Sequence, residues 1–244
     1  METFDKKDLN EHQKEKFEGY ERNSVARYLA RYENILKDLP RGKKIKVLDM
    51  GGGSGNFALA LDRYFKENGN DAEVSLLDIT RYSTWEQYAD VINIIEGSVF
   101  EAGKYFGQNY FDLIFLNGVC HHLVQTSWLK TIKGISALLV SIRSLLKENS
   151  GILCISEIYY GCSWLGEISS FIIYFLSSIK VPLIAKSLRK IGSKSSGVGV
   201  CFLSISRWRK LLTETGYKIE LMEDPKKGVK HLPLTEQFFY FVCR

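Results

Sequence analysis

The sequence predicts an α/β fold with a seven-stranded, mostly parallel sheet, helices on both faces and an antiparallel C-terminal strand. Strand-like and helix-like patterns alternate from residue 45 to residue 156. That alternation is typical of parallel strands joined by helical crossovers. The last two strand patterns have no helical pattern between them, which indicates an antiparallel hairpin at the sheet edge.

Each element follows from a local pattern. An N-terminal helical cap is expected over residues 1–42, because its apolar residues recur at helical spacing and Pro40 to Gly42 end the section. The expected strands are 45–50, 73–78, 92–96, 111–117, 151–156, 217–222 and 237–243. The expected helices between them are 55–68, 84–90, 128–147 and 204–212.

The length of 244 residues fits one domain with an appendage. We expect a single domain 1–244, with a core at 43–157, a helical insertion at 158–203 after the fifth strand and the rest of the core at 204–244. The most apolar run of the insertion, Ile168 to Ala185, contains serines, a lysine and a proline. It is too polar for a membrane span, which needs about 20 mainly apolar residues. A lid, a homodimer contact and an element on a membrane surface all stay open.

Composition restricts the class of protein. A net charge of +5, with basic residues spread over the chain and one denser stretch from Lys180 to Lys194, does not favour a nucleic-acid partner. Five scattered cysteines without C-x-x-C spacing predict reduced thiols in a cytoplasmic protein and no metal site. The charged start, M-E-T-F-D-K-K-D, does not resemble a signal peptide.

The most informative segment is Val47 to Phe57, V-L-D-M-G-G-G-S-G-N-F, in which a strand runs through glycines into a helix. Glycines allow positive φ angles and a close approach of the backbone to a ligand, and the amides of a helix N-terminus face that ligand. A dinucleotide loop, G-x-G-x-x-G, would place a third glycine where the chain has Asn56 or Ala58. Ala58 keeps a nicotinamide cofactor open but leaves the acid Asp49 unexplained.

Asp49, Gly51, Gly53 and Gly55 resemble motif I, D-x-G-x-G-x-G, of the class I (Rossmann-like) S-adenosylmethionine (SAM) methyltransferases. Asp78 ends the next strand, where a ribose-binding acid belongs. Residues 92–100 resemble the third strand of the family and its G-D-x-F element, with Ser98 in place of the acid.

The resemblance covers roughly positions 45 to 155 and continues into the fourth strand and G-V-C-H-H-L. It implies SAM as methyl donor and S-adenosylhomocysteine as product. The cofactor-binding residues that it implies are Asp49, Gly51, Gly52, Gly53, Gly55, Asp78, Ile79, Gly97, Ser98, Val99, Asn117 and Gly118.

A general base is needed only where the methyl-accepting atom carries a proton at neutral pH, and histidine suits that role. Ligands of open α/β sheets bind beyond the carboxyl ends of the strands. This rule selects His121 and His122 after the fourth strand, Glu157 after the fifth and His231 after the sixth. The alternative for the histidine pair is that one ring caps the backbone and the other packs.

Aromatic residues of the cap and the insertion are candidates for a substrate cover that excludes water from the sulfonium. They are Tyr20, Tyr28, Tyr159, Tyr160, Trp164, Phe171, Tyr174 and Phe175. A satellite core or a dimer contact is the alternative for them.

The expected function is methyl transfer from SAM to O, N or C of a small hydrophobic or aromatic metabolite, in secondary metabolism. Three alternatives stay open: a SAM enzyme that catalyses a rearrangement or cyclisation, a non-catalytic binding protein, and an oxidoreductase that uses NAD.

Overall fold

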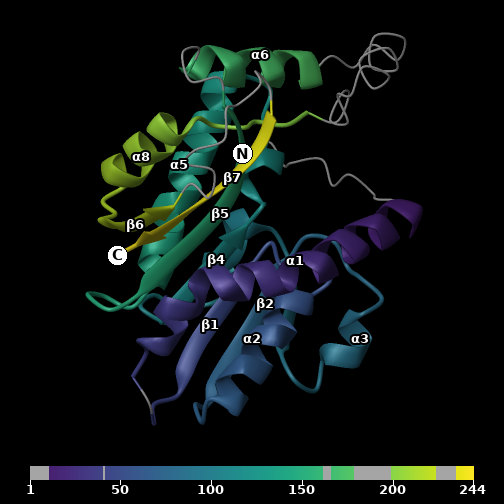
Figure 1. Cartoon of the computed structure of the whole chain (residues 1–244), viewed down its shortest axis with the longest axis vertical. Coiled ribbons are helices and arrows are strands. Elements are labelled where there is room, and N and C mark those ends of the chain that lie inside the picture. Colours follow the sequence, from purple (N-terminus) through teal and green to yellow (C-terminus); the bar gives the residue numbers. More distant parts are fainter. Residues whose placement is uncertain (1–10, 41, 162–165, 179–198, 224–234) are drawn as a thin grey trace. The chain divides into compact units, whose positions relative to one another are not determined.

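The computed structural model describes residues 11–40, 42–161, 166–178, 199–223 and 235–244 (Figure 1). The chain forms two compact units. We call residues 5–117 with 141–154 the N-terminal unit, and residues 118–140 with 155–243 the C-terminal unit. The predictions on Trp164 and His231 lie outside the described residues.

The strands form a seven-stranded sheet in the order β3-β2-β1-β4-β5-β7-β6. The parallel pairs are β1 with β2, β1 with β4 and β2 with β3, and β6 pairs antiparallel to β7. These pairings confirm the mostly parallel sheet with an antiparallel C-terminal hairpin. The strands are β1 (Ile45–Met50), β2 (Ala72–Asp78), β3 (Asn93–Glu96), β4 (Leu113–Asn117), β5 (Ile152–Gly161), β6 (Ile219–Glu223) and β7 (Thr235–Cys243).

The described helices include the expected ones and, in addition, short turns that the sequence did not indicate. The α-helices are α1 (Glu11–Lys37), α2 (Asn56–Glu67), α3 (Trp85–Tyr88), α4 (Ala102–Tyr105), α5 (Trp128–Leu145), α6 (Gly166–Ser178) and α8 (Ile205–Glu214), with 3-10 turns at Val99–Glu101 and Cys120–His122. The cap is one continuous helix from Glu11, because its internal glycine, Gly19, costs a helix only about 1 kcal/mol. Strand β5 continues to Gly161, because the residues Ile158, Tyr159 and Tyr160 favour a strand.

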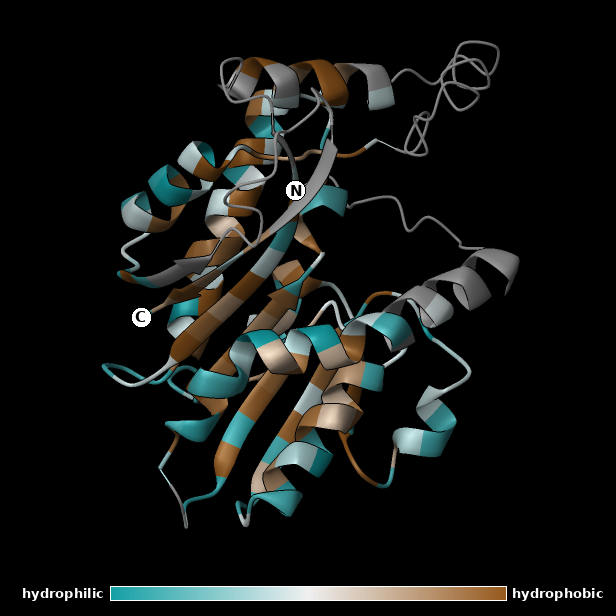
Figure 2. Cartoon of the chain, in the orientation of Figure 1, coloured by the Kyte–Doolittle hydropathy of each residue, from teal (hydrophilic) through white to brown (hydrophobic). Residues whose placement is uncertain are grey.

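The core of the N-terminal unit joins α1 and α2 to the sheet. Phe57 and Leu61 of α2 and Tyr32 of α1 are buried. The Phe57 ring lies edge-on to Phe115 of β4, with centroids 5.2 Å apart, and the Tyr32 ring is 5.0 Å from Phe115. Fully burying such a side chain contributes roughly 1.5–3 kcal/mol. Hydrophobic residues dominate the strands of the sheet (Figure 2), so this core fixes the elements that carry the glycine loop.

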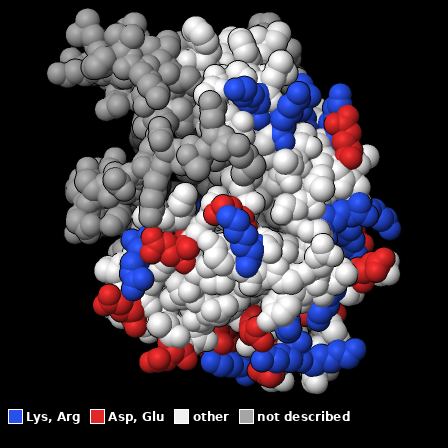
Figure 3. Space-filling model, turned by 180° about the vertical axis from the view of Figure 1, so that it is seen from behind, with Lys and Arg blue, Asp and Glu red and all other residues white. Residues whose placement is uncertain are grey.

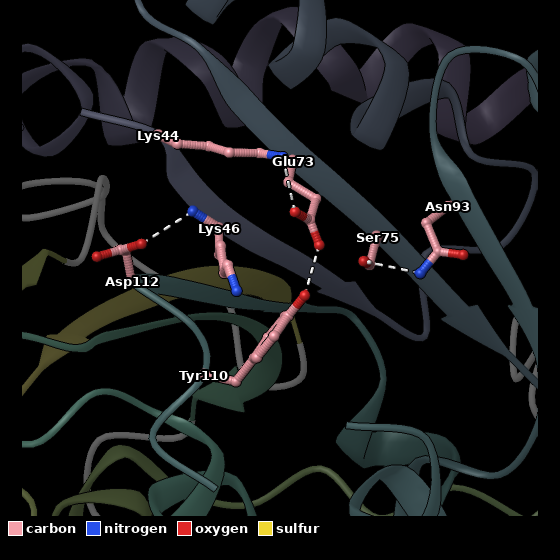
Figure 4. A network of polar contacts seen from close by, with 7 residues as sticks. All are labelled: Lys44, Lys46, Glu73, Ser75, Asn93, Tyr110 and Asp112. Atoms are coloured by element: carbon pink, nitrogen blue, oxygen red, sulfur yellow. Dashed lines mark hydrogen bonds and ion pairs between the residues drawn. The ribbon is translucent and has the colours of Figure 1, made fainter. Parts of the chain in front are cut away.

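A polar network lies at the amino ends of β1 and β2 (Figure 4). The Tyr110 hydroxyl donates to Glu73 at 2.6 Å, and the Lys44 ammonium lies 3.0 Å from the other oxygen of Glu73. The Lys46 ammonium lies 3.5 Å from the centre of the Tyr110 ring, a cation–π contact. The Tyr110 and Lys44 bonds hold the pKa of Glu73 below its ordinary value of 4.5.

We predict that Glu73 stabilises the fold at neutral pH and loses this effect in acid. Because the pKa of Glu73 is depressed in the folded state, its contribution is complete above the unfolded value of 4.5 and is lost as pH falls through the folded value. The difference in unfolding free energy between the wild type and Glu73→Gln therefore shrinks below pH 4.5. Urea unfolding at several pH values measures it, with the exposed Glu33→Gln as the control for charge loss. A difference that stays constant into acid would contradict this role.

Candidate functional site

The glycine loop between β1 and α2 requires glycine for two different reasons. Gly51, Gly53 and Gly55 have φ angles of 73°, 54° and 84°, a region that other residues adopt at a cost. Gly52 needs space instead: a Cβ there would lie 2.3 Å from both Asp49 Oδ2 and Leu76 Cδ1. The loop therefore lies directly on the buried Asp49 side chain, and α2 begins after Gly55.

Asp78, at the end of β2, holds the loop from the side. The Gly53 amide donates to Asp78 Oδ2 at 2.9 Å, and the Thr80 amide donates to Oδ1 at 2.8 Å. Burial raises the pKa of Asp78, and its backbone hydrogen bonds oppose that rise. Because a carboxylate offers about four acceptor positions, Asp78 keeps capacity for a ligand hydroxyl.

Three side chains of the α3 segment also hold the loop, and the sequence analysis missed them. We call Thr84, Trp85 and Tyr88 the α3 clamp. The Trp85 indole N–H donates to the Gly53 carbonyl at 2.9 Å, and the Thr84 hydroxyl donates to the Ser54 carbonyl at 2.7 Å. The Tyr88 hydroxyl lies 3.1 Å from Asn56 Oδ1. The only signal in the sequence was a short aromatic helix after the acid-terminated strand.

The segment after β3 has a mixed exposure. The Ser98 hydroxyl accepts the Phe100 amide at 3.3 Å and caps the following turn, while Val99 is buried. Gly97 lies against the Tyr105 side chain, because a Cβ at position 97 would be 2.6 Å from the Tyr105 hydroxyl oxygen. Ile79, which follows Asp78, exposes 37% of its surface. The apolar side chain of Ile79 and the hydroxyl of Ser98 thus follow the carboxyl ends of the neighbouring strands β2 and β3 and could contact a ligand there.

Asn117 ends β4 with its amide only partly used. Its Oδ1 accepts the Tyr32 hydroxyl at 2.8 Å. Its Nδ2 is buried and has no hydrogen-bond acceptor among the described residues. A buried amide donor without an acceptor is costly, so this donor suits a ligand oxygen. Tyr28, a predicted substrate residue on the same helix as Tyr32, is buried with its ring 5.6 Å from that of Phe57.

In the C-terminal unit, His121 and Glu157 form a buried pair. His121 Nδ1 lies 2.8 Å from Glu157 Oε2, and the Cys120 amide donates to Oε1 at 2.6 Å. The side chains of His121 and Glu157 are 9% and 1% exposed. The His121 ring stacks on Phe202 at 5.1 Å, an aromatic contact that the sequence analysis missed. When Nδ1–H donates to Glu157, the neutral ring keeps an electron pair on Nε2.

His122 differs from His121. Its ring centre is 4.0 Å from that of His121, but the residue is exposed. Nearby thiols are not nucleophiles at neutral pH, because burial raises the pKa of Cys201 to about 12 and raises that of Cys120 well above its ordinary value. In the described part of the chain, no His, Cys, Asp and Glu side chains gather in a group that could hold a metal ion.

The other predicted substrate residues fall into three groups. Tyr159 is buried and packs against Phe239 at 5.6 Å, and Tyr174 lies on the buried side of α6. Phe171 and Phe175 of α6 are exposed. Tyr20 lies in α1 and Tyr160 in β5, but their side chains are not among those that the structure describes.

Gly118, a predicted cofactor residue with a φ of 68°, donates its amide to the Ser156 carbonyl at 2.7 Å. None of the described helices is both long and apolar enough to cross a bilayer.

The parallel sheet, the glycine loop and the acid at the end of β2 define an α/β protein of the nucleoside-binding kind. A family model described as a methyltransferase domain matches residues 17–221. The chain therefore belongs to the methyltransferase family, and its fold is that of the class I SAM-dependent enzymes. A comparison with curated proteins finds no match.

Solved structures share the fold at low identity. A SAM-dependent methyltransferase of Leishmania major is 13% identical with a TM-score of 0.59, and the match covers 91% of this chain and 73% of that one. The 1,6-didemethyltoxoflavin N1-methyltransferase of Burkholderia thailandensis, solved with its substrate and S-adenosylhomocysteine, is 17% identical with a TM-score of 0.54, covering 92% and 77%. The CurJ carbon methyltransferase is 17% identical with a TM-score of 0.54, covering 85% of this chain and 50% of that one.

Proposed function

We propose that the protein transfers a methyl group from SAM to O, N or C of a small hydrophobic or aromatic molecule. The observation that carries the proposal is the glycine loop, in which Gly53 is hydrogen-bonded to Asp78 and Gly52 leaves no space for a side chain. The family supports methyl transfer. The neighbours methylate nitrogen in one protein and carbon in another, so the fold leaves the accepting atom open.

The residues of the N-terminal unit fit SAM. Asp78 would accept hydrogen bonds from the ribose hydroxyls, Ile79 would pack on the adenine ring, and Ser98 would meet the adenine amine. Asn117 Nδ2, which is buried without an acceptor among the described residues, would donate to an oxygen of the amino-acid part. The loop from Gly51 to Gly55 would hold that part. When bound, SAM would supply a methyl group on a positively charged sulfur: the acceptor atom bonds to the methyl carbon as the carbon–sulfur bond breaks, and S-adenosylhomocysteine leaves.

We assign the general base to His121, with Glu157 as its positioning residue. Glu157 holds Nδ1–H at 2.8 Å, which leaves Nε2 to take the proton of a phenol, alcohol or protonated amine. Burial of both side chains fixes the ring orientation. His122 is exposed and serves as the neighbouring control. For an acceptor that has no proton to lose, the pair has no catalytic task.

We also propose that the protein acts in the cytoplasm. The described cysteines, at positions 120, 154, 201 and 243, are buried thiols. Burial and nearby charge raise the pKa of Cys243 to about 12. Thiols of this kind suit a reducing compartment.

Label transfer tests the proposed reaction. The protein is incubated with SAM labelled at the methyl group and with a small-molecule extract of its host, and labelled products are identified by mass spectrometry. We expect label in one organic-soluble product, with S-adenosylhomocysteine formed in equal amount. Binding of SAM without label transfer to any small molecule would support a non-catalytic protein instead.

We predict that the α3 clamp supports SAM binding. Trp85→Phe removes the donor to the Gly53 carbonyl, and leaving such a partner unsatisfied costs about 1–3 kcal/mol. We expect a SAM dissociation constant about tenfold higher, since 1.4 kcal/mol is a factor of ten. Calorimetry measures it, with Trp128→Phe as the matched change in the C-terminal unit. Equal affinity in the Trp85 variant and the wild type would show that the clamp has no part in binding.

A further inference from the structure

Helix α6 presents its apolar residues to solvent. Ile168, Phe171, Ile172 and Phe175 recur at helical spacing and are 59%, 49%, 46% and 60% exposed. The opposite face, Ser170, Tyr174 and Ser177, is 4%, 7% and 2% exposed. A helix on a globular protein ordinarily turns its apolar stripe toward the core. In α6 the described side chains show the reverse, and Figure 2 shows hydrophobic residues on this helix. We call the four exposed residues the α6 face.

Specific contacts within the C-terminal unit hold α6 in this orientation. The Tyr174 hydroxyl donates to the Gln125 carbonyl at 3.0 Å. The Ser177 hydroxyl accepts the Val200 amide at 3.0 Å, and the Ser177 carbonyl accepts the Gly199 amide at 3.1 Å. The Trp128 ring packs edge-on against Tyr174 at 5.3 Å. Turning the α6 face inward would break these bonds, so its exposure is built into the fold.

The sequence around the α6 face is strongly basic. From residue 168 to residue 213 the chain has none of its 28 Asp and Glu residues. The same stretch has eight of its 33 Lys and Arg residues: Lys180, Lys186, Arg189, Lys190, Lys194, Arg207, Arg209 and Lys210. In the lower half of Figure 3, by contrast, basic and acidic side chains lie side by side. The apolar face thus belongs to the longest acid-free stretch of the chain.

We propose that the α6 face docks on an anionic lipid surface. Large apolar side chains on one side of a helix, together with lysines and arginines, are the pattern of helices that lie in the membrane interface. The four apolar residues enter the boundary between headgroups and acyl chains. The lysines and arginines of the same stretch of sequence meet the anionic headgroups, which attract basic residues near the surface. This docking does not depend on the proposed methyl transfer.

Charge argues against a second copy of the chain as the occupant. A symmetric contact places the same patch on both partners. Two acid-free basic stretches would then meet, and like charges across an interface are unfavourable. An anionic surface, in contrast, complements the whole stretch.

Vesicle flotation with the full chain tests the docking. The probes are vesicles of phosphatidylcholine alone and of phosphatidylcholine mixed with phosphatidylglycerol. We expect the protein to float with the anionic vesicles, to bind the neutral ones much less, and to be released from the anionic ones by salt. Equal binding to both vesicle types, or to neither, would overturn the proposal.

Variants separate the two parts of the surface. Phe171→Glu with Phe175→Glu is expected to weaken anionic-vesicle binding more than about tenfold, because two apolar insertions are lost. Val140→Glu, at a position 55% exposed on α5, is the matched control and is expected to bind like the wild type. Exchange of Lys186, Arg189 and Lys190 for glutamine is expected to remove the preference for anionic lipid. Unchanged binding of the phenylalanine variant would overturn the proposal. So would a dimer that is lost in that variant while no vesicle binds. A thermal melt of each variant reports that it is folded.

Discussion

Gly52→Ala is expected to weaken SAM binding by about 100-fold, which is 2.7 kcal/mol. The added Cβ would lie 2.3 Å from Asp49 Oδ2 and 2.3 Å from Leu76 Cδ1. Neither contact can relax easily, because Asp49 and Leu76 are buried in neighbouring strands. The loop itself must then move away from the sheet, and the amides along it lose their alignment with the ligand. Calorimetric titration with SAM measures the effect.

The control for this change is Gly103→Ala. No atom lies within 4 Å of a Cβ at Gly103, which belongs to helix α4, so the same chemical change meets open space. We expect wild-type affinity for SAM in that variant. Gly52→Ala also overpacks the strand ends, at a cost of roughly 1–3 kcal/mol of stability, so a thermal melt must show that the variant is folded at the titration temperature. Wild-type SAM affinity in folded Gly52→Ala would show that the loop is not part of the SAM-binding site.

His121→Gln is expected to lower kcat by about 100-fold to 10,000-fold, the usual contribution of a general base. The glutamine keeps a similar volume against Phe202 and Glu157 but cannot take a proton. Because His121 lies in the C-terminal unit and the glycine loop in the N-terminal unit, SAM affinity is expected to stay within about twofold, well under 1 kcal/mol. Initial rates with the acceptor found by label transfer, together with SAM titrations, separate the two effects.

Two further variants test the roles within the pair. Glu157→Gln keeps an oxygen for the Cys120 amide but replaces the charged acceptor of Nδ1–H by a neutral amide, so we expect a smaller fall in kcat than for His121→Gln. His122→Gln, at the exposed neighbour, is expected to leave kcat unchanged. Full activity of His121→Gln on an acceptor that carries a dissociable proton would contradict the assignment.

The arrangement of strands and helices was largely predictable from the sequence because each element carries its own periodic pattern. Strand β1 has the predicted bounds, α2 is shorter than predicted by one residue at each end, and β2 begins one residue earlier than predicted. The errors have physical causes. Three strand-forming residues lengthen β5 into the expected insertion. The turns from Val99 to Tyr105 were missed because they are too short to show a period.

Sequence patterns predicted the candidate site only where a single short segment carries the signal. The glycine loop and Asp78 follow from motif and spacing, but their support from Trp85 joins residues 32 positions apart. The sequence alone does not distinguish His121 from His122 as the candidate base. In the structure, the bond to Glu157, 36 residues away, distinguishes them. The α6 face shows the same limit, because its spacing indicates an apolar side, whereas the bonds of Tyr174 and Ser177 decide which side is buried.

The most direct test of the central claim is a calorimetric titration of the protein with SAM, S-adenosylhomocysteine and NAD. Because the loop lies against Asp78 and position 52 has no space for a side chain, we expect the protein to bind both adenosyl ligands and not NAD. Tighter binding of S-adenosylhomocysteine than of SAM would fit product inhibition of a transferase. Binding of NAD without SAM would instead make the protein an oxidoreductase on this fold. No heat with any of the three would mean that the glycine loop does not bind a nucleoside cofactor.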